Sequence, residues 1–299
     1  MNSTRALVPF VAATLATTAT ANAGTRAWDA LKAKLPAGTA VIVAADVAAV
    51  RGTPSFPKLL EWATTEEQDI GEAINAIKQG CSIDLPAAFD DIAVAVNTDG
   101  DGVIAFALTG LDQAKVEGCV RTILTASDPK AKISIKPVGK LTEYAVGSDR
   151  LYVAWLAKDI LAISTDVAKR DGLDAMLAGA AATGDLGTYV TRAGTKSAVW
   201  GAFLVNDDGF KGGYGTLSLG STLKVALRLS GMTAADGKKG RDELAKAGKD
   251  GRTRTAKDPE LSKIFSSWKV GGKGAEVTLD LNVPEKSLPA LVPALDKVF

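Results

Sequence analysis

The feature that most constrains the fold is a regular alternation of apolar and polar side chains near the C-terminus. Apolar residues occupy every second position of residues 277–283 and of residues 223–229. Successive side chains of a strand point to opposite faces, so this alternation is typical of an antiparallel sheet with one apolar face. Segments with helical spacing of apolar residues lie between such strands and would cover that face. The sequence therefore predicts an α+β fold.

The predicted elements occur twice in the same order. The tripeptide Ala-Gly-Thr at residues 37–39 precedes a strand-like segment at 40–47, and the same tripeptide at 193–195 precedes another at 197–205. Each of these strands is followed by a predicted hairpin and then by a helix. This order predicts an internal duplication, with a chance likeness between two α+β halves as the alternative.

The duplication predicts two similar lobes. Each is expected to be an antiparallel sheet covered on one face by helices, and each is expected to end in a helical segment, at residues 167–177 and at 287–299. We place the first lobe at residues 24–185 and a second, smaller lobe at residues 186–299.

Cys81 and Cys119 are the only cysteines, and both fall on predicted helices. Gly80 is typical of the end of a helix whose apolar positions are 70, 73, 74 and 77, and Cys81 follows it directly. Cys119 lies within a second apolar stripe at positions 116, 120, 123 and 124. We predict a structural disulfide between them, with two buried free thiols as the alternative. The absence of a C-x-x-C motif disfavours a redox role.

Residues 1–23 have the composition of a secretory signal peptide. Arg5 is the only charged residue among them, and Ala21-Asn22-Ala23 forms an A-x-A cleavage site. This pattern predicts cleavage between Ala23 and Gly24 and a periplasmic or secreted protein. An uncleaved anchor is the alternative, but the apolar part is shorter than the roughly 20 strongly apolar residues that span a bilayer. We expect no transmembrane segment after cleavage.

Charge balance and the lack of histidine exclude several classes of function. Removal of Arg5 reduces the 35 Lys and Arg residues to 34, which balance the 34 Asp and Glu residues. A chain with zero net charge exerts no long-range attraction on nucleic acid. Without histidine there is no Ser-His-Asp triad, no histidine acid–base catalysis and little prospect of a zinc, copper or haem site. We predict no cofactor, no metal and no nucleic-acid partner.

Two segments match the S-x-x-K motif of penicillin-recognising serine enzymes, Ser55 with Lys58 and Ser266 with Lys269. In such enzymes the lysine lies one helical turn from the nucleophilic serine. The motif has only two fixed positions, and neither S-D-N nor K-T-G accompanies it. We interpret Ser55 as the N-cap of a helix with Pro57 in its first turn.

The turn Asn97-x-Asp99-x-Asp101-Gly resembles the first half of a calcium-binding loop. The twelfth position, a bidentate Glu in such loops, is Leu108. Asn, Asp and Gly are also the residues that hairpin turns prefer. A plain turn is therefore favoured, with calcium binding left open. Asp90 and Asp91 could add ligands only if the fold brought them near.

Three further features are assigned structural roles. The glycine-rich segments 209–215 and 271–274 lack the phosphate-loop pattern and are predicted to be turns and strand ends. Residues 238–257 carry eight basic and three acidic side chains and are predicted to form a solvated helix to about residue 246, followed by a mobile loop. Contact with an anionic surface is the functional alternative there. Five tryptophans are assigned to the core: Trp28, Trp62, Trp155, Trp200 and Trp268.

The sequence resembles a group of uncharacterised exported bacterial envelope proteins with tandem sheet-plus-helix units. The resemblance rests on residues 35–43, on residues 46–51 and on Cys-Ser-Ile-Asp at residues 81–84. It implies export and this architecture, and it carries no activity or site residue.

We expect an exported, non-catalytic binding or interaction protein of the cell envelope. Its partner would be an unknown protein or an apolar or anionic envelope ligand, and no catalytic residue is assigned. The alternative is a histidine-free hydrolase or glycan-active enzyme that uses carboxylates or a Ser-Lys pair. A structural or assembly role is a third hypothesis.

Overall fold

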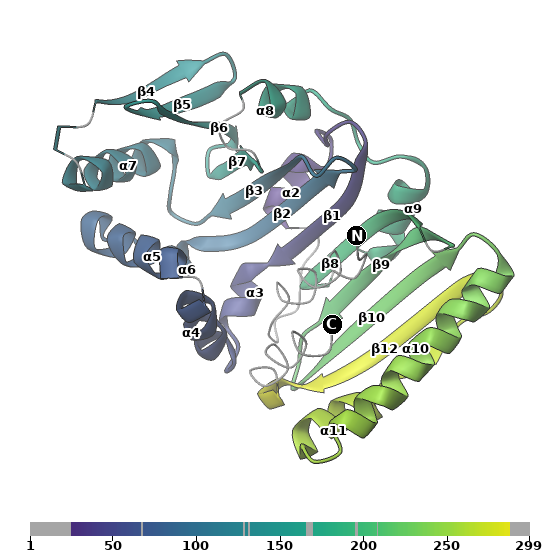
Figure 1. Ribbon diagram of the computed structural model, residues 1–299. Coiled ribbons are helices and arrows are strands. Elements are labelled where there is room, and N and C mark those ends of the chain that lie inside the picture. The colour runs from purple at the N-terminus through teal and green to yellow at the C-terminus, as the bar shows by residue number, and fades with distance from the viewer. Residues whose placement is uncertain are drawn as a thin grey trace. The chain divides into compact units, whose positions relative to one another are not determined.

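The computed structural model describes residues 25–287, except for residues 67, 128, 131, 166–169, 195–196 and 208, and shows an α+β protein (Figure 1). The chain divides into two compact units, one formed by residues 25–48 and 61–183 and the other by residues 49–60 and 184–287. The strands within each unit pair in antiparallel fashion, as predicted from the alternation. In this described part of the chain, no helix is long and apolar enough to cross a membrane.

The first unit, here called the seven-stranded unit, has the strand order β1-β2-β3-β7-β6-β5-β4. Its strands are β1 (Thr39–Asp46), β2 (Phe89–Asn97), β3 (Gly102–Leu108), β4 (Ile133–Val138), β5 (Leu141–Val146), β6 (Asp149–Ala157) and β7 (Ile160–Ser164). Its helices are α2 (Arg26–Leu31), α5 (Gln68–Cys81), α6 (Leu85–Ala88), α7 (Gln113–Ser127) and α8 (Arg170–Leu177). The short α3 (Val47–Arg51) and α4 (Phe56–Glu66) lie where the chain passes from one unit to the other.

A row of alanines forms the centre of this sheet. Its members are directly opposite one another on β1, β2, β3, β7 and β6, and all are buried: Ala44, Ala93, Ala105, Ala162 and Ala154. The short side chains leave room for α2, which contacts four of these strands and buries Ala27, Trp28 and Leu31 completely or nearly so. The small residues of the sheet therefore position a helix that begins two residues after the predicted cleavage site.

Helices lie on both faces of this sheet. Asp91 is two residues from Ala93 on β2, so it shares the face with α2, and it accepts a hydrogen bond from the backbone N–H of Ala27. Thr142 faces the other way and accepts a hydrogen bond from Gln113 of α7. The prediction that helices cover one face is therefore too simple for this unit.

The second unit, here called the five-stranded unit, has the strand order β11-β12-β10-β9-β8. Its strands are β8 (Val199–Asp207), β9 (Phe210–Ser218), β10 (Thr222–Gly231), β11 (Lys269–Gly271) and β12 (Glu276–Pro284). Its helical elements are α9 (Gly184–Ala193), α10 (Ala234–Arg254), α11 (Pro259–Ser266) and the 3-10 turn η2 (Glu285–Ser287).

The predicted alternation fits the register of this sheet. Leu223 pairs with Val283 and Leu229 with Val277, so the apolar positions of β10 and β12 share one face. That face receives α10, because a side chain at Gly240 would touch Val277. The opposite face of the same strands carries polar side chains and is here called the polar face.

The predicted end of the polar helix near residue 246 is wrong. Helix α10 continues to Arg254 and begins with a capping box between Thr233 and Asp236. Glycines usually weaken a helix, but Gly240, Gly248 and Gly251 are buried, and an added Cβ would come within 2.4 Å of an aromatic ring at each position. Rings of Phe210, Trp268 and Phe265 occupy the space that side chains would need. Packing therefore outweighs the helix propensity.

The remaining element predictions are partly confirmed. The hairpin β2–β3 and the helices α4 and α5 are found where they were expected. The helix predicted at 167–177 begins at Arg170 in α8, with residues 166–169 outside the described part. The helical segment predicted at 287–299 falls beyond residue 287, which is the last described residue and ends η2.

Candidate functional site

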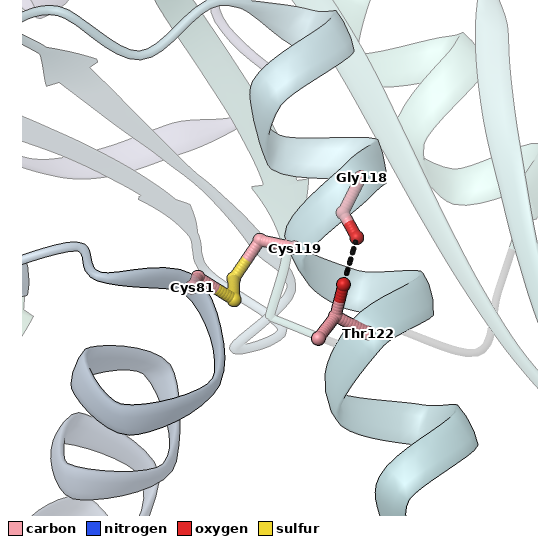
Figure 2. Close-up of a disulfide and its surroundings, with 4 residues drawn as sticks. All are labelled: Cys81, Gly118, Cys119 and Thr122. Carbon is pink, nitrogen blue, oxygen red and sulfur yellow. Dashed lines mark hydrogen bonds between the residues drawn. A yellow bond between two sulfur atoms is a disulfide. The ribbon is translucent and has the colours of Figure 1, made fainter.

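The structure joins Cys81 to Cys119, as predicted. Figure 2 shows the bond between the end of α5 and the middle of α7, with an S–S distance of 1.97 Å and a Cα–Cα distance of 5.3 Å. One turn beyond the bridge, the Thr122 hydroxyl donates to the Gly118 carbonyl (Figure 2). The bridge borders an open hollow whose floor includes the buried residues Ala88 and Leu111.

Polar groups around the disulfide are mostly engaged within the protein. The Lys115 ammonium donates to the carbonyl of Gly110 at 2.7 Å. The Asp84 carboxylate accepts from the backbone N–H of Ala87, and Thr109 donates to Asp90. The hollow beside the disulfide therefore offers few polar groups to a ligand.

Ser55 is not positioned as a nucleophile activated by Lys58. Its hydroxyl is buried and lies 2.8 Å from a carboxylate oxygen of Glu285, which also accepts the Ser55 backbone N–H. Lys58 is exposed in the first turn of α4. In the second motif, the Ser266 hydroxyl donates to the carbonyl of Lys263. These hydrogen bonds secure the start of α4 and the end of α11.

The Asn97 loop is a tight hairpin turn. The side-chain oxygen of Asn97 accepts the backbone N–H groups of Asp99 and Asp101 at 2.9 and 3.0 Å. Asp91 lies near the opposite end of β2 and cannot join this loop. The described residues contain no group of three or more His, Cys, Asp or Glu side chains that could hold a metal ion.

Asp90 and Asp91 instead anchor the start of α2. Asp91, of which 5% is exposed, accepts the backbone N–H groups of Arg26 and Ala27 at 3.2 and 2.7 Å. The Arg26 guanidinium donates to Asp90 at 3.0 Å and to Asp159 at 2.5 Å. Burial raises the pKa of Asp91, and the bonds from Ala27 and Arg26 partly offset this effect. This acidic cluster is thus occupied by the chain itself.

We expect Asp91 to give an unusual pH dependence of stability. Because the pKa is raised in the folded protein, the protonated carboxyl is favoured by folding, and its contribution to stability declines as pH rises above the ordinary pKa of 3.8. Asp91→Asn keeps an acceptor oxygen but does not titrate. Urea denaturation at a series of pH values should show the variant gaining stability relative to wild type as pH rises. A trend of opposite sign would refute the assignment.

A second charged cluster on β4, β5 and β6 is also self-contained. Glu143 accepts from Lys136 at 3.1 Å and from the Tyr152 hydroxyl at 3.1 Å. The bond from Lys136 is the main reason that the pKa of Glu143 is lowered. Partial burial and the bond to Glu143 raise the pKa of Tyr152. The cluster ties three strands together.

An open hollow of about 630 Å³ on the five-stranded unit differs from these clusters. It is lined by Arg192, Tyr214, Ser230, Ala275 and Glu276, and is here called the sheet hollow. Arg192 comes from the last turn of α9, Tyr214 from β9, and Ser230 and Glu276 from the ends of β10 and β12 that lie side by side. Residues of α9, β9, β10 and β12 thus form one site.

Strand register explains how these side chains meet. Ser230 pairs with Glu276 on one side and with Gly212 on the other, so the three positions form a row across the polar face. Tyr214 lies two residues from Gly212 along β9 and therefore points to the same face. The absence of a side chain at Gly212 lets α9 approach this row closely.

Gly212 also fixes the position of α9. Its φ of 145° and a Cβ that would lie 2.2 Å from the Phe203 carbonyl oxygen both require glycine there. The ring of Tyr189, a buried residue of α9, would lie 3.0 Å from the same Cβ. Arg192 follows Tyr189 by three residues, on the same side of the helix. Close packing of α9 on this glycine thus brings the guanidinium to the sheet hollow.

The polar side chains of the sheet hollow have no side-chain partners among the residues that the structure describes. Arg192, Tyr214, Ser230 and Glu276 make no side-chain hydrogen bond or ion pair with any residue of the described part. The neighbouring Arg228, in contrast, donates to Asp280 at 2.7 Å. A cation, an anion, a phenol and a hydroxyl that converge on a hollow without partners form a candidate ligand-binding site.

Sequence reasoning missed this site because no local motif marks it. Arg192 looks like an ordinary basic residue in the last turn of a helix. Ser230 and Glu276 look like the solvent-facing positions of strands with alternating polarity. The available signal was Tyr214 within the glycine-rich segment 209–215. That segment and residues 271–274 form turns and strands, as predicted.

The other predicted residues have structural surroundings or fall outside the description. Trp28 and Trp200 are buried, whereas Trp62, Trp155 and Trp268 are half-buried. Much of the charged face of α10 pairs internally, with Lys238 at 2.6 Å from Asp242. The predicted cleavage site at Ala23 and Gly24 precedes the first described residue. Comparison with protein-family models, with curated proteins and with solved structures found no match.

Proposed function

We propose that this protein is an exported, non-catalytic binding protein of the cell envelope and that its ligand binds in the sheet hollow. The observation that carries the proposal is a set of four polar side chains around one hollow that have no side-chain partner in the described part of the chain. The acidic clusters around Asp91 and Glu143, in contrast, are satisfied by internal bonds. Groups left without partners at a concave surface are available to fix the orientation of a ligand.

Export to the periplasm or medium is supported by two independent features. Residues 1–23 have the pattern of a cleavable signal peptide with cleavage before Gly24. The Cys81–Cys119 disulfide is of a kind that persists in oxidising compartments. We propose a periplasmic or secreted location on this basis.

Binding is favoured over catalysis because the groups considered for hydrolysis have structural partners. Ser55 is held by Glu285 and does not engage Lys58. The sheet hollow contains a single carboxylate, Glu276, whereas glycoside hydrolysis usually needs two.

We also propose that the two halves of the mature chain, residues 24–185 and 186–299, are similar lobes derived by duplication. Element order supports this proposal: once the helices α3 to α6, which lie between β1 and β2 and have no counterpart, are set aside, α2-β1-β2-β3-α7 in the first matches α9-β8-β9-β10-α10 in the second. In each, the last strand of the unit returns to pair with the strand before the long helix, β7 with β3 and β12 with β10. The candidate ligand site belongs to the second lobe alone.

Native mass spectrometry of protein purified from its own envelope or medium tests the proposed function. The intact mass should match that of a chain that starts at Gly24, less the two hydrogen atoms that are lost when the disulfide forms. Wild type should retain additional mass under gentle conditions, and the double variant Arg192→Gln, Tyr214→Ala should lose it. Lys224→Gln is the matched control, since Lys224 is an exposed residue of β10 on the same polar face. Equal retention of ligand by the double variant would refute the site.

A further inference from the structure

We infer that the sheet hollow recognises a carboxylated saccharide, a short chain of sugar rings that carries carboxylate groups. This inference rests on the proposed function and names the ligand class for the same site. Its basis is the combination of one guanidinium, one carboxylate, one phenol ring and one hydroxyl around the hollow. Each of these groups matches a different part of such a ligand.

Arg192 supplies the contact that selects a carboxylate. A guanidinium presents parallel N–H donors that bind a carboxylate in a bidentate manner, with more strength and geometric selectivity than a neutral hydrogen bond. Arg192 is exposed in the last turn of α9 and has no acidic partner in the described part of the chain. A ligand carboxylate would therefore find this cation unoccupied.

Glu276 and Ser230 supply contacts to hydroxyl groups. A carboxylate accepts hydrogen bonds only, and a hydroxyl both donates and accepts, so the pair suits the donor–acceptor hydroxyls of a sugar. Their side chains are adjacent across β10 and β12. Tyr214, two residues along β9 from Gly212, adds a ring whose face can cover the apolar C–H face of a sugar ring.

The charge and size of the hollow argue against other small ligands. Phosphate groups favour several cations or a helix N-terminus, whereas this hollow pairs one cation with one anion. Glu276 would repel a dianion but tolerates a ligand in which single carboxylates alternate with hydroxyls. A volume of about 630 Å³ is also larger than a free amino acid needs and suits a chain of a few rings.

Calorimetric titration with a trimer of galacturonic acid tests this inference, and its fully methyl-esterified form is the matched probe. The two trimers share rings and hydroxyls, and they differ in that methyl ester groups replace the charged carboxylates. The acid should bind wild type at least about tenfold more tightly than the ester, because a charge-assisted hydrogen bond to Arg192 is lost. Arg192→Gln should remove this preference for the acid. Tyr214→Ala should weaken the binding of both trimers, and Lys224→Gln should leave the affinity for each trimer unchanged. Added salt should weaken the binding of the acid trimer and leave the binding of the ester unchanged.

The outcomes separate this inference from the proposed function. If acid and ester bind equally and Tyr214→Ala weakens the binding of both, recognition of a carboxylate is overturned, but the proposal that a ligand binds in the hollow is retained. Failure of both trimers to bind, while the double variant loses its native ligand in mass spectrometry, would overturn the saccharide class and keep the function. Failure of both trimers, with no hollow-dependent ligand in mass spectrometry, would overturn both proposals.

Discussion

Replacement of Cys81 and Cys119 by alanine is expected to lower the free energy of unfolding of the seven-stranded unit by about 4 kcal/mol. The two cysteines are 38 residues apart, and the bridge removes the corresponding loop entropy from the unfolded chain. Few other interactions fasten α5, because Ile74 and Ile77 on its apolar side are only half-buried. Helix α5 contacts chiefly α7, to which the bridge joins it. Urea denaturation of wild type and double variant measures the loss.

Two controls distinguish the bridge from the side chains around it. Wild type treated with a reductant should unfold at the same urea concentration as the double variant, since both lack the covalent link. Hydrogen exchange should speed up in α5 and in the middle of α7, and it should stay unchanged in the alanine row of the sheet. A loss below about 1 kcal/mol would show that packing, and not the bridge, holds α5.

The strands could be predicted from the sequence because their signal is local. Alternation over residues 223–229 and 277–283 indicates both the strand type and the face that is apolar, and the observed pairing of Leu223 with Val283 places these apolar positions on one face. The helix-end signal of Gly80 is likewise local and lies one residue before the observed end of α5 at Cys81. In these two cases the residues that determine the element are neighbours in the chain, whereas the disulfide could be predicted because the chain has only two cysteines.

The second half of α10 could not be predicted, because its determinants are distant. Gly248 and Gly251 weaken a helix by propensity, and only the rings of Trp268 and Phe265 show why glycine is needed there. The strand partners and helix that assemble the sheet hollow are likewise far apart in sequence. Arg192 reaches the hollow only because α9 packs on Gly212. Tertiary contacts of this kind leave no local pattern.

Asp91 is a second example of a residue whose contacts could not be predicted from the sequence. Asp90 and Asp91 were expected to add calcium ligands only if the fold brought them near the Asp-rich turn. Instead, Asp91 accepts the backbone N–H groups of Arg26 and Ala27 at the start of α2, and Asp90 accepts from the Arg26 guanidinium. Position along β2 decides this, because Asp91 and Asn97 lie near opposite ends of the strand.

Substitution of alanine for glycine should have opposite effects at two helical positions. Gly237 lies in the first turn of α10, where a Cβ would be 2.4 Å from the Gly274 carbonyl oxygen and 2.7 Å from backbone atoms of Ala275. Backbone cannot yield as a flexible side chain can, so we expect Gly237→Ala to lower the free energy of unfolding by about 3 kcal/mol. Gly118 lies inside α7 with no atom within 4 Å of its Cβ position. There the better helix propensity of alanine should raise stability by about 1 kcal/mol.

The contrast tests whether α10 is held by close backbone approach. In urea denaturation followed by tryptophan fluorescence, Gly237→Ala should unfold at a lower urea concentration than wild type, and Gly118→Ala at a higher one. A stabilised Gly237→Ala would mean that the helix can move away from residues 274–275 without cost, and the glycines of α10 would then need another explanation. Because α10 covers the apolar positions of β10 and β12, a shift of this helix should also weaken ligand binding at Ser230 and Glu276 on the opposite face. Stability and binding should therefore fall together in Gly237→Ala, whereas Gly118→Ala should leave binding unchanged.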